Sequence, residues 1–241
     1  MEFRNTAGYG PDMITQYYLQ KAHSQITIWD VTNIAAIRQL ETTLTDSLMI
    51  FRQATDSLRQ FIAFDGSFYY PVIPLGKIPN QDLHGLASPQ LIIVTHPAFL
   101  AQANRLADFH TRENELTVQV VTTGTVYNEF GGGSPDATAI RDLVRFFYEK
   151  ADSLSRPRYL LLMGDGSYDP KNRIPGNNNF IPTFQSTESL SHTGSFVTDD
   201  YYGILDEPYG QEANGPIRIG IGRFPVSDTV TANVMVNKII H

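Results

Sequence analysis

Acidic side chains and glycines follow one buried strand of this sequence. The run Tyr159–Met163 (YLLLM) is apolar and strand-sized, and it ends abruptly in Gly-Asp-Gly. In open α/β sheets, functional loops follow the carboxyl ends of the strands. Further carboxylates come later in the chain, so this stretch is the first place to look for chemistry. The candidate loop residues are Gly164, Asp165, Gly166, Asp169, Asp199 and Asp200.

These carboxylates permit two interpretations. Asp165, Asp169, Asp199 and Asp200 could together bind a calcium ion, because calcium takes several oxygen ligands at flexible geometry. Such a site could serve a metal-assisted hydrolase, although the spacing is not that of an EF-hand loop. Alternatively, the acids are solvated, and Asp165 holds its own turn by accepting hydrogen bonds from backbone N–H groups. An aspartyl nucleophile is not indicated, because no D-x-D-x-T pattern follows the strand.

The other usual catalytic groups form no recognisable site. The chain has no cysteine, which excludes a thiol nucleophile, a disulfide or a thiolate zinc site within these residues. Its six histidines show no metal-ligand spacing, and the best placed, His96 before Pro97, is expected to cap or pack. No G-x-S-x-G elbow occurs, and Gly131–Gly133 lacks the pattern of a phosphate-binding loop. We therefore expect no catalytic residue among these 241 and no bound cofactor.

Elements of a parallel sheet surround the Gly-Asp-Gly loop. Leu91–Thr95 is a continuous apolar strand, as expected for a sheet covered on both faces. The next strands are Leu116–Thr122 and Tyr159–Met163. A helix that begins after Pro97 precedes the first of them, and a second helix, capped by Ser134, lies between the two. The order strand, helix, strand, helix, strand predicts right-handed crossovers. Apolar residues at helical spacing should face the sheet: Leu100, Ala103, Leu106 and Ala107 in the first helix, and Ile140, Leu143, Val144 and Phe147 in the second.

Two more strands and a closing helix are expected near the end. Tyr201–Leu205 and Ile217–Gly222 have strand-like composition, and Ser227–Ile240 reads as a helix with Ser227 as its N-cap.

The first third of the chain has a different pattern. Short runs rich in β-branched and aromatic residues, separated by polar turns, predict antiparallel strands, as at the end of a β-sandwich. A proline-rich passage, Pro71–Pro79, follows them. We therefore divide the chain into a β-rich region with its linker, residues 1–86, and an α/β region, residues 87–241. The four predicted strands of the first region are Ile14–Gln20, Ile26–Asp30, Leu48–Ala54 and Arg59–Phe64.

Composition restricts the class of protein. A hydrophobic share of 41% supports a sizeable core, and the net charge of −7 argues against a nucleic-acid partner, which selects a basic face. No apolar run is long enough to span a bilayer, so no transmembrane segment is expected.

Several segments together resemble the peptidase domain of the gingipain-type cysteine peptidases. They lie in the order expected for that domain and cover about two-thirds of the chain. Within the family, the linker Ile78–Leu86 and the turn Trp29–Asn33 resemble the sortases of the type IX secretion system. The segments of the peptidase domain itself are Ile92–Phe99, Val126–Phe130, Pro135–Asp142, Tyr159–Asp165, Thr198–Gly203 and Ile219–Pro225.

The resemblance implies a caspase-like α/β fold of two subdomains. The catalytic histidine, in a Gly-His-Gly setting, and the catalytic cysteine of that family lie in the second subdomain. His241 is not in that setting, so no catalytic role is carried onto it. We expect this chain to end near the close of the first subdomain and to be inactive alone. Gly164–Asp169 and Thr198–Gly203 would then be loops beside the substrate cleft.

The resemblance also implies a biological role. Such a sortase removes C-terminal sorting domains from secreted cargo proteins and attaches the cargo to the cell surface. It would work with outer-membrane components of the type IX system, on the extracellular face of the outer membrane. Two alternatives remain open from the residues: a binding or scaffold module that reuses the fold without catalysis, and the metal-assisted hydrolase considered above.

Overall fold

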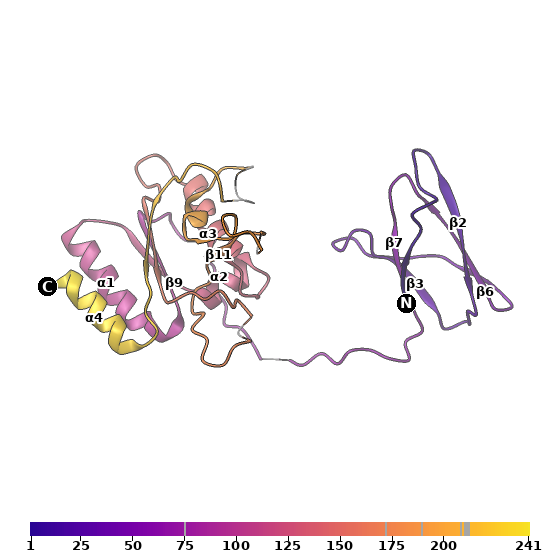
Figure 1. Ribbon diagram of the computed structural model, residues 1–241, viewed down its shortest axis with the longest axis horizontal. Coiled ribbons are helices and arrows are strands. Elements are labelled where there is room, and N and C mark those ends of the chain that lie inside the picture. The colour runs from indigo at the N-terminus through magenta and orange to yellow at the C-terminus, as the bar shows by residue number, and fades with distance from the viewer. Residues whose placement is uncertain (75, 172, 189, 208, 210–212) are drawn as a thin grey trace. The chain divides into compact units, whose positions relative to one another are not determined.

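The computed structural model divides the chain into two compact units, Met1–Lys77 and Ile78–His241. It describes residues 1–74, 76–171, 173–188, 190–207, 209 and 213–241. The division falls between Lys77 and Ile78, earlier than the boundary after residue 86 that composition suggested. Each unit buries hydrophobic side chains of its own. Figure 1 labels strands and helices of both units.

The first unit consists of two antiparallel sheets. One has the strand order β1-β7-β3-β4 and the other β2-β6-β5. Each of the four strands predicted from the sequence is present within a residue of its expected bounds. The strands are β1 (Glu2–Arg4), β2 (Ile14–Gln20), β3 (Thr27–Asp30), β4 (Arg38–Gln39), β5 (Thr43–Thr45), β6 (Leu48–Ala54) and β7 (Gln60–Phe64).

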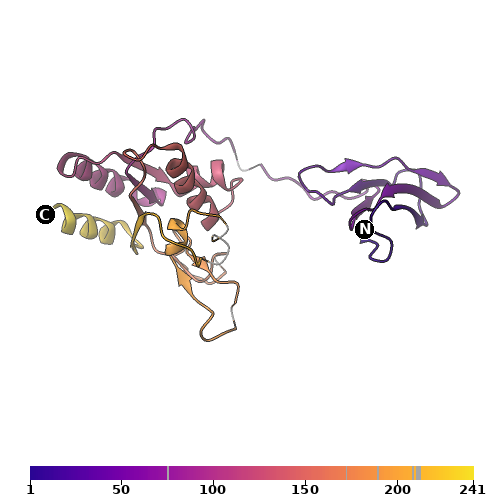
Figure 2. The same ribbon diagram turned by 90° about the horizontal axis from the view of Figure 1, so that it is seen from above.

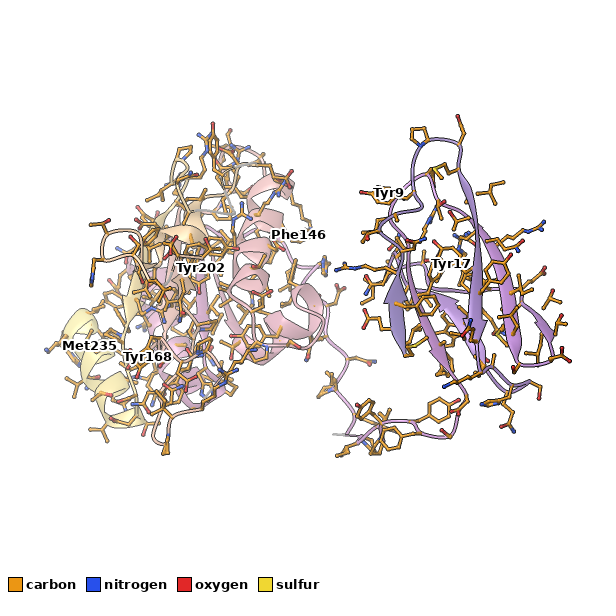
Figure 3. The ribbon with its side chains drawn as sticks, turned by 45° about the vertical axis from the view of Figure 1, so that its right-hand side comes forward. Tyr9, Tyr17, Phe146, Tyr168, Tyr202 and Met235 are labelled. Atoms are coloured by element: carbon orange, nitrogen blue, oxygen red, sulfur yellow. The ribbon has the colours of Figure 1, made fainter. Side chains whose placement is uncertain are left out.

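Aromatic side chains join these two sheets. Tyr17 of β2 stacks on Phe51 of β6 with ring centroids 4.9 Å apart, and it meets Phe61 of β7 edge-on at 5.0 Å. Figure 3 labels Tyr17 among the side chains of this core. Alternation along β6 and β7 buries Met49, Phe51, Phe61 and Ala63 while their neighbours remain more exposed, as expected for sheets that each bury one face.

The second unit is built on a four-stranded parallel sheet in the order β13-β10-β8-β9. This confirms the predicted α/β class with a parallel sheet beside an antiparallel β region. The central strand β8 is buried at every position, because helices cover both faces of the sheet. The strands are β8 (Leu91–Thr95), β9 (Val118–Thr122), β10 (Tyr159–Met163) and β13 (Gly220–Phe224).

The helices lie in two layers. Figures 1 and 2 show α1 (Leu100–Glu113) and α4 (Thr229–Ile240) side by side on one flank of the sheet, with α2 (Thr123–Phe130) and α3 (Ala137–Lys150) on the other. Side chains alternate along the strands accordingly. Ile92 and Leu160 join the core under α2 and α3, whereas Ile93 and Met163 join the core under α1 and α4.

The structure corrects several local predictions. The helix assigned to Ser134 begins at Ala137, and Asp136 is its N-cap, accepting a hydrogen bond from the Thr138 N–H at 2.8 Å. In the closing helix the cap is Asp228, not Ser227, because the Asp228 carboxylate accepts from two N–H groups. The predicted strand Tyr201–Leu205 is instead the 3-10 helix η2 (Asp200–Gly203). Helix α2 was not predicted.

The described residues of the connection between β10 and β13 carry little regular structure. Besides η2 it contains a two-stranded antiparallel ladder, β11 (Phe184–Gln185) with β12 (Val197–Thr198). Tyr201 and Tyr202 of η2 are buried in the core under α3; Figure 3 labels Tyr202 inside this unit. None of the helices in the described part of the chain is long and apolar enough to cross a membrane.

Candidate functional site at the carboxyl ends of the strands

The strand order creates a switch point between β8 and β10. The chain passes from β8 outward to β9 and then returns across β8 to form β10 and β13. In open α/β sheets such a reversal leaves a crevice outside the strand ends, where ligands commonly bind. Here the loops after β8 and β10 meet at that point, since the His96 N–H donates to the Met163 carbonyl at 3.3 Å.

His96 has the capping and packing role that the sequence predicted. Its Nδ1 accepts from the Ala98 N–H at 3.3 Å at the start of the 3-10 helix η1 (Pro97–Phe99). Its ring lies edge-on to Phe180, with centroids 4.9 Å apart. Burial lowers the pKa of His96, which favours the neutral imidazole that a cap requires.

Gly164 makes the sharp turn after β10. Its φ of +155° lies in the region that side chains disfavour, and a Cβ there would approach the Phe180 Cβ to 2.9 Å. The next residue, Asp165, uses mainly its backbone: its carbonyl accepts from the N–H groups of Phe180 and Ile181, both at 3.0 Å. The Asp165 side chain accepts from the Gly166 N–H at 3.0 Å, which is the turn-holding interpretation made from the sequence.

Asp169, further along the chain, makes hydrogen bonds with its side chain and with its backbone. It is 8% exposed, and its Oδ2 accepts from the Ile174 N–H at 2.8 Å. Its carbonyl accepts from the Asn177 side chain, also at 2.8 Å, and its N–H donates to Ser167 Oγ. Asp169 therefore links Ser167, Ile174 and Asn177 by hydrogen bonds.

Asp199 is bound to Arg223, near the end of β13. The two groups form a bidentate ion pair, with Nε and Nη2 each 2.7 Å from a different carboxylate oxygen. Asp200 begins η2, where its backbone N–H donates to Thr198 Oγ1 at 3.1 Å and the residue is exposed. The two neighbouring acids therefore have different environments.

Arg223 is the residue that unites these loops, and the sequence analysis did not single it out. Besides Asp199, its Nη1 donates to the carbonyls of Gly164 and Ile181, each at 2.9 Å, and its Nη2 donates to the Pro182 carbonyl at 3.1 Å. All five N–H donors of the guanidinium are therefore used. Burial lowers the pKa of Arg223, but the Asp199 carboxylate outweighs it, and the net shift of the pKa is upward.

Tyr202 adds a further contact to the same carbonyl. Its buried hydroxyl donates to the carbonyl of Pro182, which also accepts from Arg223. Burial raises the pKa of this phenol well above its ordinary value, so it stays a hydrogen-bond donor. We name the network of Arg223, Asp199, Tyr202 and the carbonyls of Gly164, Ile181 and Pro182 the arginine clamp.

The calcium interpretation gains no support from this geometry. The described residues contain no group of three or more His, Asp or Glu side chains placed to hold a metal ion. Both Asp199 oxygens bind the Arg223 guanidinium, and Asp169 and Asp165 accept backbone N–H groups of their own loop. Three of the four carboxylates considered from the sequence thus have separate partners, and the fourth, Asp200, is exposed at the start of η2.

A pocket of about 890 Å³ opens beside the arginine clamp, where α3 begins. Pro182, Phe184 and Tyr201 give it apolar walls, and Thr138 and Gln185 add polar groups. Its size and mixed lining suit a stretch of peptide. With no thiol in the chain, this edge can position a peptide segment but has no nucleophile of the cysteine type.

Comparisons with known proteins identify the family of this chain and a solved structure that it resembles. The family model of peptidase family C25 matches residues 84–241, which is most of the second unit. The chain therefore belongs to this family, the gingipain-type cysteine peptidases. It is also similar to PorU of Porphyromonas gingivalis, whose dimeric latent form is known as a crystal structure, with a TM-score of 0.83 and 30% identity. No curated protein matches the chain.

The extent of the structural match limits what it conveys. It covers 99% of this chain, including the antiparallel unit, but only 24% of the PorU chain. The match thus includes elements of both units, and this chain spans about a quarter of the length of the PorU chain. The activity, substrates and partners of a whole protein are taken up below as proposals.

Proposed function

We propose that this chain is the first subdomain, with its preceding β region, of a type IX secretion sortase. The sortase would remove C-terminal sorting domains from secreted cargo and attach the cargo to the cell surface. The observation that carries this proposal is the likeness to PorU along nearly the whole chain, at 30% identity, together with the family match. The antiparallel unit matters here because it lies outside the family match and inside the structural one.

The proposed reaction is covalent catalysis by a cysteine peptidase. A thiolate attacks the peptide carbonyl, the C–N bond breaks, and a histidine transfers the proton to the departing amine. The acyl-enzyme then reacts with water, which gives hydrolysis, or with an amine of the cell surface, which gives transpeptidation. The cysteine must come from outside these residues, because the chain has none. We therefore propose that this chain alone is inactive.

This chain would contribute a rigid wall of the cleft. The loops Gly164–Asp169 and Thr198–Gly203 lie at the carboxyl edge of the sheet, and the arginine clamp fixes both of them. Loops that are ordered before substrate arrives lower the entropy lost on binding and hold the peptide in a reactive geometry. The pocket beside Phe184 and Tyr201 would receive part of the peptide.

The location and partners follow from the same proposal. The protein would act on the extracellular face of the outer membrane, on secreted cargo and beside outer-membrane components of the type IX system. A net charge of −7 agrees with the absence of nucleic acid from this list of partners.

A complementation experiment tests the proposal. The source organism, with the gene deleted, should accumulate cargo that retains its sorting domain, and the full-length gene should restore removal, as seen by the cargo's mass on an immunoblot. A gene carrying Arg223→Met should restore it poorly, because the cleft loops lose their clamp, whereas Arg112→Gln on the surface of α1 should restore it fully. Normal cargo processing in the deletion strain would refute the sortase assignment.

A non-catalytic scaffold module is the second candidate, favoured by the absence of cysteine. The complete reading frame separates the two. A Gly-His-Gly motif and a cysteine beyond His241 support the sortase, and a complete frame without them supports the scaffold. Purified protein of 241 residues should cleave no cargo under either candidate, so cleavage by this chain alone would contradict both.

A further inference from the structure

A second pocket lies at the opposite edge of the parallel sheet, where β10 and β13 begin. It has a volume of about 360 Å³ and is lined by three arginines. Tyr148, Tyr159 and Ser153 also line it, and no Asp or Glu belongs to its described lining. The arginines, Arg156, Arg158 and Arg218, define what we name the arginine pocket.

Arg156 is held in place by an aromatic ring. Its guanidinium lies over the ring of Tyr148, 4.6 Å from the centroid, which restricts the side chain without using its N–H donors. Its Nε is buried and has no hydrogen-bond partner in the described structure. A buried donor without a partner costs stability, which a bound acceptor would recover.

Arg158 is presented from a rigid backbone. Its N–H donates to the Gln90 carbonyl and its own carbonyl accepts from the Gly220 N–H, both at 2.8 Å, so the residue is fixed at the start of β10. Its side chain is exposed and forms no ion pair within the described residues. Arg158 therefore offers a complete guanidinium to the pocket.

Arg218 uses only part of its set of N–H donors. Its Nε donates to Asp206 Oδ2 at 2.8 Å, and its Nη2 donates to the same oxygen, which leaves Nη1 for another acceptor. The other nearby acid, Asp152, is not in the lining, and its Oδ1 already accepts from the N–H groups of Leu154 and Ser155 and from Ser155 Oγ. Asp206 therefore offsets the charge of Arg218, and Asp152 lies close enough to Arg156 for their charges to interact, whereas Arg158 has no carboxylate partner among the described residues.

We propose that the arginine pocket binds a phosphate monoester. Planar guanidinium groups donate paired hydrogen bonds that match phosphate oxygens, and they do so better than lysine. Arg158 has no ion-pair partner among the described residues and the buried Nε of Arg156 has no hydrogen-bond partner there, so both guanidinium groups can donate to the several oxygens of one phosphate dianion. The volume accommodates a phosphoryl group with a small sugar or lipid headgroup attached, but not a long polymer. The protein's overall charge of −7 makes diffuse attraction of anions a poor explanation.

Titration with inorganic phosphate tests the site directly. Backbone amide resonances of the whole 241-residue chain are followed by NMR at constant ionic strength. We expect saturable shifts confined to residues 153–159 and 217–220. Arg158→Gln should weaken binding about tenfold, as expected for loss of one charge-assisted pair. Because Arg158 is exposed, this variant should keep the wild-type melting temperature. Arg156→Gln should weaken binding similarly.

Matched controls decide the interpretation. Arg112→Gln removes one exposed arginine from α1 and should bind phosphate as the wild type does. Acetate, a monoanion, should bind clearly more weakly than phosphate. Shifts that never saturate, an equal loss in Arg112→Gln, or acetate binding as tight as phosphate would each overturn the proposal.

Two further ligands distinguish the natural source of the phosphoryl group. Glucose 1-phosphate represents a phosphorylated saccharide, and vesicles containing phosphatidic acid represent a lipid headgroup, with phosphatidylcholine vesicles as the blank. Competition by the sugar phosphate at the same resonances assigns the saccharide. Flotation with phosphatidic acid that is lost in Arg158→Gln assigns the lipid. Failure of both, with inorganic phosphate also silent, leaves no phosphate site.

Discussion

Removing the guanidinium of the arginine clamp tests whether that network orders the strand-end loops. Arg223→Met keeps most of the side-chain volume and deletes all five hydrogen bonds. The carbonyls of Gly164 and Ile181 lose their Arg223 partner, and the Asp199 carboxylate is left with no cation opposite it. Each of these consequences destabilises the second unit.

The expected cost follows from the burial of the pair. Breaking a buried ion pair by removing one partner costs about 3–5 kcal/mol. The Asp199 side chain is 27% exposed, so water can partly solvate it, and we expect a value near the lower limit, about 3 kcal/mol. For a unit of this size, that corresponds to a fall of about 6–12 °C in the melting temperature.

The chain offers separate probes for its two units. Its single tryptophan, Trp29, lies in β3 of the first unit, whereas the α-helices of the described residues all lie in the second. Urea unfolding followed by helical circular dichroism should shift to lower urea in Arg223→Met. The tryptophan fluorescence transition should stay where it is in the wild type.

Two variants make the test specific. Arg218→Met breaks an exposed ion pair with Asp206 and should destabilise the second unit far less. The double variant R223M/D199N removes the carboxylate charge as well, so it should be more stable than Arg223→Met alone. If Arg223→Met unfolds at the same urea concentration as Arg218→Met, the arginine clamp does not hold these loops.

Three further perturbations address the turn, the core and pH. Gly164→Ala should lower the free energy of unfolding by about 1–3 kcal/mol, because this glycine has a positive φ and lies against Phe180. Gly124→Ala, inside α2 with open space around it, should raise the free energy of unfolding by about 0.5–1 kcal/mol. Leu143→Ala in the fully buried face of α3 should cost about 2–5 kcal/mol; denaturant unfolding measures all three. Because burial lowers the pKa of His96, the unfolded chain protonates this group at higher pH than the folded chain does. The free energy of unfolding should therefore fall as pH drops below about 6.5, and His96→Asn, which keeps a capping side chain, should lose that part of the fall.

Each of these three predictions has a result that would contradict it. Equal effects of Gly164→Ala and Gly124→Ala would show that the turn after β10 tolerates a side chain. A cost below about 1 kcal/mol for Leu143→Ala would mean that the α3 face repacks around the cavity. The same pH dependence in His96→Asn and wild type would assign it to other groups.

Sequence patterns predicted β8 and β10 at their observed bounds because their signals are local, whereas the strand expected at Ile217–Gly222 is β13, Gly220–Phe224. Leu91–Thr95 and Tyr159–Met163 are apolar at successive positions, and that alone indicates strands covered on both faces. The inner face predicted for α3 is fully buried. Helix α2 was missed because it has only eight residues and follows β9 directly, with Thr122 as both strand end and N-cap.

Tertiary packing explains the remaining differences between the sequence predictions and the structure. The composition of Tyr201–Leu205 favours a strand, but Tyr201 and Tyr202 are both buried in the core under α3, and a 3-10 turn allows two adjacent side chains to do this. Arg223 could not be assigned from its neighbours in sequence, because its acceptors come from distant segments of the chain. The one local sign was a charge within an otherwise apolar strand, Gly220–Phe224.

The long sequence separations within the arginine clamp have a consequence for the kinetics of folding. Arg223 lies 24 residues from Asp199, 42 from Ile181 and 59 from Gly164, so forming these contacts first would close long loops at high entropic cost. The hydrogen bonds of Arg223 should therefore form after the rate-limiting step. In a chevron plot, Arg223→Met should accelerate unfolding and leave the refolding rate nearly unchanged. The lifetime of the folded state, more than the speed of reaching it, would depend on this one side chain.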